Sequence, residues 1–122
     1  FLGGAIAPGI KTSATALFEH TAKLPNVDLE TPNRVICKNT IENMQAGLIF
    51  GQMGLAERII EGMKKELVSD YGKKYEDIKV IATGGMATMV DSGVSCIDVI
   101  DRRLTLDGLV EVYEKNKAVR KK

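Results

Sequence analysis

The strongest constraint in this sequence is one long run of helical periodicity in the middle of the chain. Its apolar residues mostly recur every four positions, which places them in one stripe: Ile41, Met44, Leu48, Leu55, Ile59, Met63 and Leu67. A helix from Asn39 or Thr40 to about Val68 would have roughly 28 residues and a length of about 42 Å. Asn39, followed three residues later by Glu42, is a capping-box arrangement that marks its start. We therefore expect a long helix whose apolar stripe faces a partner.

Three glycines lie inside this expected helix, at Gly47, Gly51 and Gly54. Each costs about 1 kcal/mol relative to alanine in a helix interior. Because their spacing of four and three residues puts them along one side, the close approach of another helix or of a ligand would explain them.

Shorter elements are expected before this helix. The apolar segment Phe1–Ala7 favours a strand that ends at Pro8-Gly9. Thr12 or Ser13 would cap a first helix, with an apolar face that ends before Pro25: Ala14, Leu17, Phe18, Thr21 and Leu24. Val27 and Leu29 alternate with acidic residues and favour a short strand with one solvated face.

Two strands and a last helix are expected after it. The run from Ile78 to Ala82 is mainly apolar, as in a buried strand, and Ile97–Ile100 favours another. Thr105 would cap a helix that turns Leu106, Leu109, Val110 and Tyr113 inward. A basic tail, residues 117–122, would follow. This order of elements predicts an α/β fold with helices covering a sheet.

Composition excludes several classes of protein. The chain has 122 residues and 13.3 kDa, which is one domain or part of one. Its net charge of +1 offers no electrostatic reason to bind nucleic acid or an anionic membrane. The longest uncharged stretch, Asn43–Ala56, has 14 residues and is too short to span a bilayer. Two cysteines without a pairing pattern favour a reducing, cytoplasmic location.

Two segments have a composition that suits ligand binding. Lys38-Asn39-Thr40 combines free N–H groups and a hydroxyl at a helix start, which suits a carboxylate or phosphate, although plain capping explains it as well. Thr83-Gly84-Gly85 follows an apolar strand, where nucleotide groups often bind, although a purely structural turn is the alternative. Neither the dinucleotide nor the P-loop fingerprint is present.

The other reactive residues carry weaker signals. His20 is the single histidine and fits a surface or packing role, and no His/Cys cluster has metal-ligand spacing. Cys37 has no histidine near it in sequence that would activate it as a nucleophile. Nothing selects a catalytic base among the three aspartates near the last strand, Asp98, Asp101 and Asp107.

Taken in order, several segments closely resemble the C-terminal half of type III pantothenate kinases. The resemblance covers nearly all of residues 1–116 and rests on these segments: Gly3-Gly4-Ala5-Ile6-Ala7-Pro8-Gly9-Ile10, Leu17-Phe18, Thr21-Ala22-Lys23-Leu24-Pro25, Lys38-Asn39-Thr40, Met44-Gln45-Ala46-Gly47, Ile81-Ala82-Thr83-Gly84-Gly85 and Leu104-Thr105-Leu106-Asp107-Gly108-Leu109. It implies a ribonuclease-H-like domain of the actin/hexokinase/Hsp70-like fold, here the C-terminal half of a two-domain kinase, missing its first strand or strands. Residues 1–116 would form this domain.

The resemblance also implies a function. The family phosphorylates pantothenate with ATP, the first step of coenzyme A synthesis, as a homodimer that needs Mg²⁺ and a monovalent cation (K⁺ or NH₄⁺). Thr40, with Asn39 beside it, matches the threonine that contacts pantothenate, and Thr83-Gly84-Gly85 occupies the place of the adenosine-side turn.

Several residues of the family pattern have no counterpart in these 122 residues. The Asp-x-Gly-x-Thr phosphate loop and the Gly-x-Asp-Arg segment with the catalytic aspartate are missing, and Cys37 stands where glycine is usual. Because the chain opens with the apolar residues Phe1-Leu2, we expect a fragment cut inside a strand, with its partner N-terminal half upstream. Because the catalytic base and the phosphate loop are missing from it, we expect this fragment to be inactive alone. The alternative is a non-catalytic regulatory or interaction protein that keeps the fold.

The resemblance and the three helical glycines together predict a homodimer that uses the long helix and the glycine-rich strand end. The alternative is that these glycines face the chain's own sheet or the N-terminal half.

Overall fold

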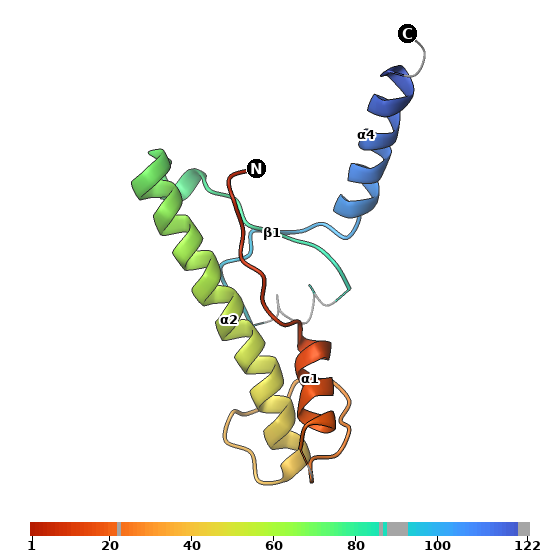
Figure 1. Cartoon of the computed structure of the whole chain (residues 1–122). Coiled ribbons are helices and arrows are strands. Elements are labelled where there is room, and N and C mark those ends of the chain that lie inside the picture. The colour runs from red at the N-terminus through yellow and green to blue at the C-terminus, as the bar shows by residue number, and fades with distance from the viewer. Residues whose placement is uncertain (22, 86, 88–92, 120–122) are drawn as a thin grey trace.

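The computed structural model describes residues 1–21, 23–85, 87 and 93–119, and it forms a small α/β unit built on one long helix. Along the chain lie these elements: α1 (Ile10–Glu19), α2 (Thr40–Tyr71), the 3₁₀ turn η1 (Tyr75–Asp77), β1 (Ile81–Ala82), β2 (Val99–Ile100) and α4 (Leu104–Val119). Figure 1 shows α1 beside the first part of α2, the N-terminal segment running up past β1, and α4 projecting away from the rest. None of the helices described is long and apolar enough to cross a membrane.

Helix α2 confirms the long helix and extends it to 32 residues. Asn39 is its N-cap, and its side-chain oxygen accepts a hydrogen bond from the Glu42 N–H at 2.9 Å. The helix ends at Tyr71, and its C-cap is Gly72, whose φ of 62° lies in the left-handed region that glycine adopts at little cost. The end therefore lies three residues beyond Val68, the end expected from periodicity.

The core lies where α1 crosses the first half of α2. It is small and consists of five buried residues: Ile10, Leu48, Ile49, Met53 and Val94. Val27 and Leu29 pack against it while Asp28 and Glu30 stay exposed, so the alternation between them is confirmed. The expected strand there is wrong, because no neighbouring strand pairs with this segment among the described residues.

The sheet consists of two short parallel strands, with Ile81 opposite Val99 and Ala82 opposite Ile100. Asp98 reinforces the pairing, because its side chain accepts a hydrogen bond from the Val80 N–H at 2.7 Å. Both strands lie where the sequence predicts, but the prediction of a buried strand at Ile78–Ala82 is wrong. Only two of its residues are in the ladder, and half of the Ile81 surface is exposed.

The expected strand at Phe1–Ala7 is also wrong. Residues 1–9 form no ladder, and Phe1 and Ile6 are fully exposed. An apolar segment becomes a strand only when its N–H and C=O groups pair with a neighbouring strand, and neither described strand pairs with residues 1–9.

The cap expected for the first helix is wrong. Helix α1 begins at Ile10, with Gly9 as N-cap and no side-chain cap, so Thr12 and Ser13 lie within the helix. It ends at Glu19, earlier than the apolar spacing suggests. Starting at Ile10 allows that side chain to be buried against α2.

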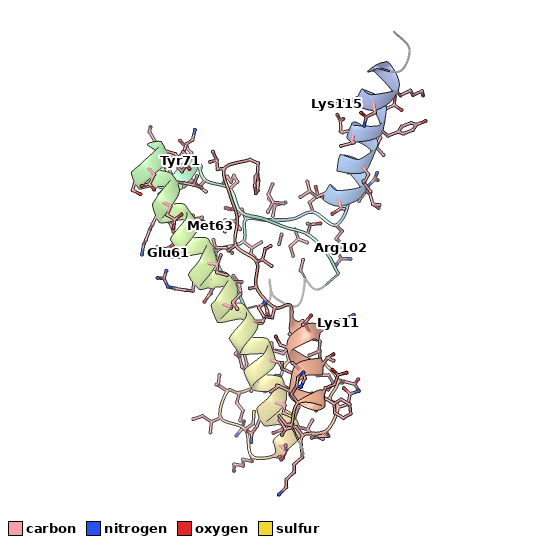
Figure 2. The ribbon with its side chains drawn as sticks, in the orientation of Figure 1. Lys11, Glu61, Met63, Tyr71, Arg102 and Lys115 are labelled. Atoms are coloured by element: carbon pink, nitrogen blue, oxygen red, sulfur yellow. The ribbon has the colours of Figure 1, made fainter. Side chains whose placement is uncertain are left out.

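Two expectations for the last helix are wrong as well. Helix α4 begins at Leu104, so Thr105 lies inside its first turn and is not the cap. The apolar residues expected to face inward are more than half exposed: Leu106, Leu109, Val110 and Tyr113. Figure 2 shows Lys115 on α4 far from the labelled side chains of α2. The helix continues through Val119, and the last three basic residues of the expected tail lie outside the described part.

The total exposed surface is large for the mass. The chain exposes 9405 Å², whereas a compact monomer of this mass exposes about 6,500 Å². Most of the apolar residues of α4 and of the N-terminal segment contribute to this excess. The surface available for contact with other protein is therefore extensive.

Candidate functional site

A polar cavity of about 580 Å³ lies at the start of α2. The loop that precedes the helix supplies one wall and the first two turns of α2 supply the other. Its lining is mainly polar: Glu30, Thr31, Pro32, Asn33, Arg34, Cys37, Lys38, Asn39, Glu42 and Gln45. Two cations, two carboxylates and several amide groups therefore border one space. Such a lining suits a small polar molecule that carries both an anionic group and hydrogen-bonding groups.

Asn39 lines this cavity, and its side-chain oxygen is occupied by the Glu42 N–H. Its amide nitrogen makes no hydrogen bond to the described residues, so it is available to an acceptor. Because α2 has 32 residues, the partial positive charge of its peptide dipoles adds to the attraction for an anion at this end.

Thr40 is the first residue of α2 and is exposed. It follows a lining residue but is not itself among the residues that line the cavity. The structure therefore brings Asn39 to the cavity and leaves Thr40 next to it.

Cys37 lines the same cavity and is half-buried. Its thiol donates a hydrogen bond to the Arg34 carbonyl oxygen, with an S···O distance of 3.2 Å. This contact closes a tight local loop before Lys38. The thiol therefore has a local structural partner at the position where the resembled family usually has glycine.

Gln45 is a buried lining residue that the sequence analysis does not assign to a site. It is 8% exposed, and its amide nitrogen donates a hydrogen bond to the Asp28 carbonyl oxygen at 2.9 Å. The feature of the sequence that could have identified Gln45 is its spacing from two buried residues of the same helix. Gln45 precedes the buried residues Leu48 and Ile49 by three and four positions, so an uncharged polar side chain lies on the inward side of the helix.

The second predicted segment, Thr83-Gly84-Gly85, follows β1 and does not line the cavity at α2. Gly84 has a φ of 98°, which side chains other than hydrogen rarely allow, and its carbonyl oxygen accepts a hydrogen bond from the Ala87 N–H. No described atom lies within 4 Å of where a Cβ would be at Gly84 or Gly85. The described residues therefore leave the space next to these two positions open. In Figure 1, β1 lies well away from the start of α2.

The side chains whose pKa values are shifted do not line the polar cavity. Tyr75 donates a hydrogen bond to Glu61 at 2.7 Å, and this bond, followed by contact with Lys65, lowers the pKa of the Glu61 carboxyl. The same bond raises the pKa of the Tyr75 hydroxyl. Figure 2 shows Glu61 on the upper half of α2, the half away from α1, so this pair is remote from the polar cavity.

The hydrogen bond from the Val80 N–H, and then the positive charge of Lys79, lower the pKa of Asp98. The Asp98 carboxylate therefore has a structural role next to the strand pair, where it accepts the Val80 N–H. Among the residues that the structure describes, no group of three His, Cys, Asp or Glu side chains is placed to hold a metal ion.

Comparison with protein families identifies one match. The family model described as type III pantothenate kinase matches residues 1–62, which is half of the chain. The matched region contains the complete lining of the polar cavity, including Asn39, and also Thr40. The turn at Thr83-Gly84-Gly85 lies outside it. The chain therefore belongs to the type III pantothenate kinase family.

Proposed function

We propose that this chain is the C-terminal, ribonuclease-H-like domain of a kinase that transfers phosphate from ATP to pantothenate, giving 4'-phosphopantothenate. One observation carries the proposal. The polar cavity at the start of α2 lies wholly within the family match and has the mixed lining that a polar, anionic substrate requires.

In this proposal the start of α2 binds pantothenate. The Asn39 amide nitrogen and the Thr40 hydroxyl are hydrogen-bond donors that lie next to each other at the positive end of the helix. Pantothenate carries a carboxylate, an amide and two hydroxyls, which match these donors and the nearby charges of Arg34 and Lys38. The role of these residues is to bind and orient the substrate.

The adenosine of ATP is assigned to the turn at Thr83-Gly84-Gly85. The support is that no described atom lies within 4 Å of where a Cβ would be at Gly84 or Gly85, so a planar group could approach the backbone there. Phosphoryl transfer depends on positioning and on neutralising charge, and the base and the phosphate loop belong to the N-terminal half.

The described residues include no group of three His, Cys, Asp or Glu side chains placed to hold a metal ion. We therefore assign Mg²⁺ and the monovalent cation (K⁺ or NH₄⁺) to the N-terminal half and to ATP itself. No step that involves them is derived for this chain.

The proposed partners are the N-terminal half and a second copy of the enzyme, in the cytoplasm. The large exposed surface supports a need for partners. Gly47, Gly51 and Gly54 support the second copy. Outside the backbone of the helix itself, no described atom lies within 4 Å of where a Cβ would be at any of them, so packing within the described residues does not require glycine there. In this proposal residues 1–116 form the domain and residues 117–122 a basic tail.

An ADP-release assay with ATP, Mg²⁺, K⁺ and pantothenate tests the function. It compares this chain alone with the complete enzyme, meaning the chain joined to its N-terminal half. We expect pantothenate-dependent turnover from the complete enzyme only, because a general base contributes about 10²–10⁴ in rate and the chain has no assigned one. Turnover by the chain alone would show that the catalytic residues are misassigned. A complete protein without turnover would favour the non-catalytic alternative.

A further inference from the structure

Gln45 stands out among the residues that line the polar cavity. It is the one buried polar side chain in the described part of the chain, with 8% of its surface exposed. It lies in the second turn of α2, between the buried residues Met44 and Ala46. Burying a carboxamide costs free energy unless its polar atoms find partners, so its position calls for a specific contact.

That contact joins two segments that are distant in sequence. The Gln45 amide nitrogen donates to the Asp28 carbonyl oxygen at 2.9 Å, across 17 residues. The other side-chain hydrogen bonds in the cavity wall, Cys37 to Arg34 and Glu42 to Asn39, span only three residues each. They shape the loop locally but do not attach residues 28–32 to the helix. The bond from Gln45 does.

We propose that Gln45 is a positioning residue for the substrate. By holding the Asp28 carbonyl against α2, it sets where Glu30, Thr31 and Pro32 stand relative to Asn39, and so sets the width of the cavity. This inference rests on the proposed function, because it takes pantothenate as the occupant. When the cavity wall is already ordered, substrate binding does not have to order it and loses less conformational entropy. The hydrogen bond from Gln45 should therefore increase the affinity for the substrate.

Gln45→Met tests the role, since methionine has a similar length and shape but cannot donate. The variant is expected to fold, because the Asp28 carbonyl oxygen still accepts the Glu30 N–H at 3.0 Å. Gln45→Glu keeps the shape but replaces the donor with an anionic acceptor. The matched control is Gln52→Met, seven residues along the same helix and outside the lining of this cavity.

In the complete enzyme, we expect Gln45→Met and Gln45→Glu to raise the KM for pantothenate about tenfold, the loss typical of one good hydrogen bond. The KM for ATP and kcat should change less than about twofold, and Gln52→Met should match the wild type. Amide hydrogen exchange should become faster in residues 29–36 in both Gln45 variants and not in the control.

The outcomes separate the two claims. Loss of kcat with an unchanged pantothenate KM would assign Gln45 a purely structural role and overturn the inference. Unchanged exchange in residues 29–36 would overturn the anchor itself. A wild-type enzyme that transfers no phosphate to pantothenate would overturn the proposed function instead, and the exchange measurement would still decide whether Gln45 holds the wall.

Discussion

The cap of α2 is the local contact on which the candidate site depends, and Asn39→Ala removes it. In the native structure the Glu42 N–H donates to the Asn39 side chain at 2.9 Å, and the Asn43 N–H donates to the Asn39 carbonyl oxygen at 2.9 Å. Alanine leaves the Glu42 N–H without its partner. Replacing asparagine by alanine at an N-cap costs about 1 kcal/mol.

That free energy corresponds to about a fivefold change in the equilibrium for opening the first turn. We therefore expect the Asn43 amide of Asn39→Ala to exchange about fivefold faster in the complete enzyme, and the Glu42 amide to lose its protection. Amide hydrogen exchange followed by NMR measures both. Asn39→Asp is the matched control, because aspartate keeps the acceptor and its charge favours a helix N-terminus. Wild-type exchange rates in Asn39→Ala would refute the reasoning that this bond stabilises the site.

Three further predictions follow from other parts of the molecule. Gly51→Leu should convert the complete enzyme from dimer to monomer by light scattering, since a Cβ at this position has no described atom within 4 Å outside the backbone of its own helix; a variant that stays dimeric would remove this face from the interface. Tyr75→Phe should raise the pKa of Glu61 toward its ordinary value of 4.5, because the hydroxyl favours the charged carboxylate. A carboxyl with a lowered pKa stabilises the fold above its unfolded pKa and loses that contribution as pH falls through the folded pKa. The variant should therefore lose less stability than the wild type on acidification, and an NMR titration with an unmoved Glu61 pKa would contradict this. Finally, the 122-residue chain alone should release no ADP above a protein-free blank.

Local chemistry explains what the sequence predicts well. The cap at Asn39 involves two residues three positions apart, so the residue types at the start of the helix are enough to predict it. The long periodic stripe predicts the existence and direction of α2, although Leu48 is the one residue of the stripe that belongs to the described core at α1. The two strands at Ile81 and Val99 could be located from their apolar residues, although the length of the ladder could not.

Apart from the helix caps expected at Thr12 or Ser13 and at Thr105, the failures concern partners that local sequence does not contain. Whether Phe1–Ala7 pairs as a strand, or whether Leu106 and Leu109 are buried, depends on surfaces from other parts of a fold. The role of Gln45 was missed for the same reason. Its partner is the backbone carbonyl of Asp28, 17 residues away. Every residue has a backbone carbonyl, so the residue types do not show which one accepts this hydrogen bond. The neighbouring Thr40 was expected at the site by resemblance, whereas the cavity lining itself includes Asn39.

The central claim is that the start of α2 faces pantothenate, and Thr40→Val in the complete enzyme tests it most directly. Valine keeps the shape of threonine, and the hydroxyl makes no hydrogen bond to the described residues, so the fold should be unaffected. The account predicts that kcat/KM for pantothenate falls about tenfold, equivalent to about 1–2 kcal/mol for one lost hydrogen bond, while kcat/KM for ATP at saturating pantothenate changes little. An unchanged kcat/KM for pantothenate would contradict the claim and leave the start of α2 with a capping role alone.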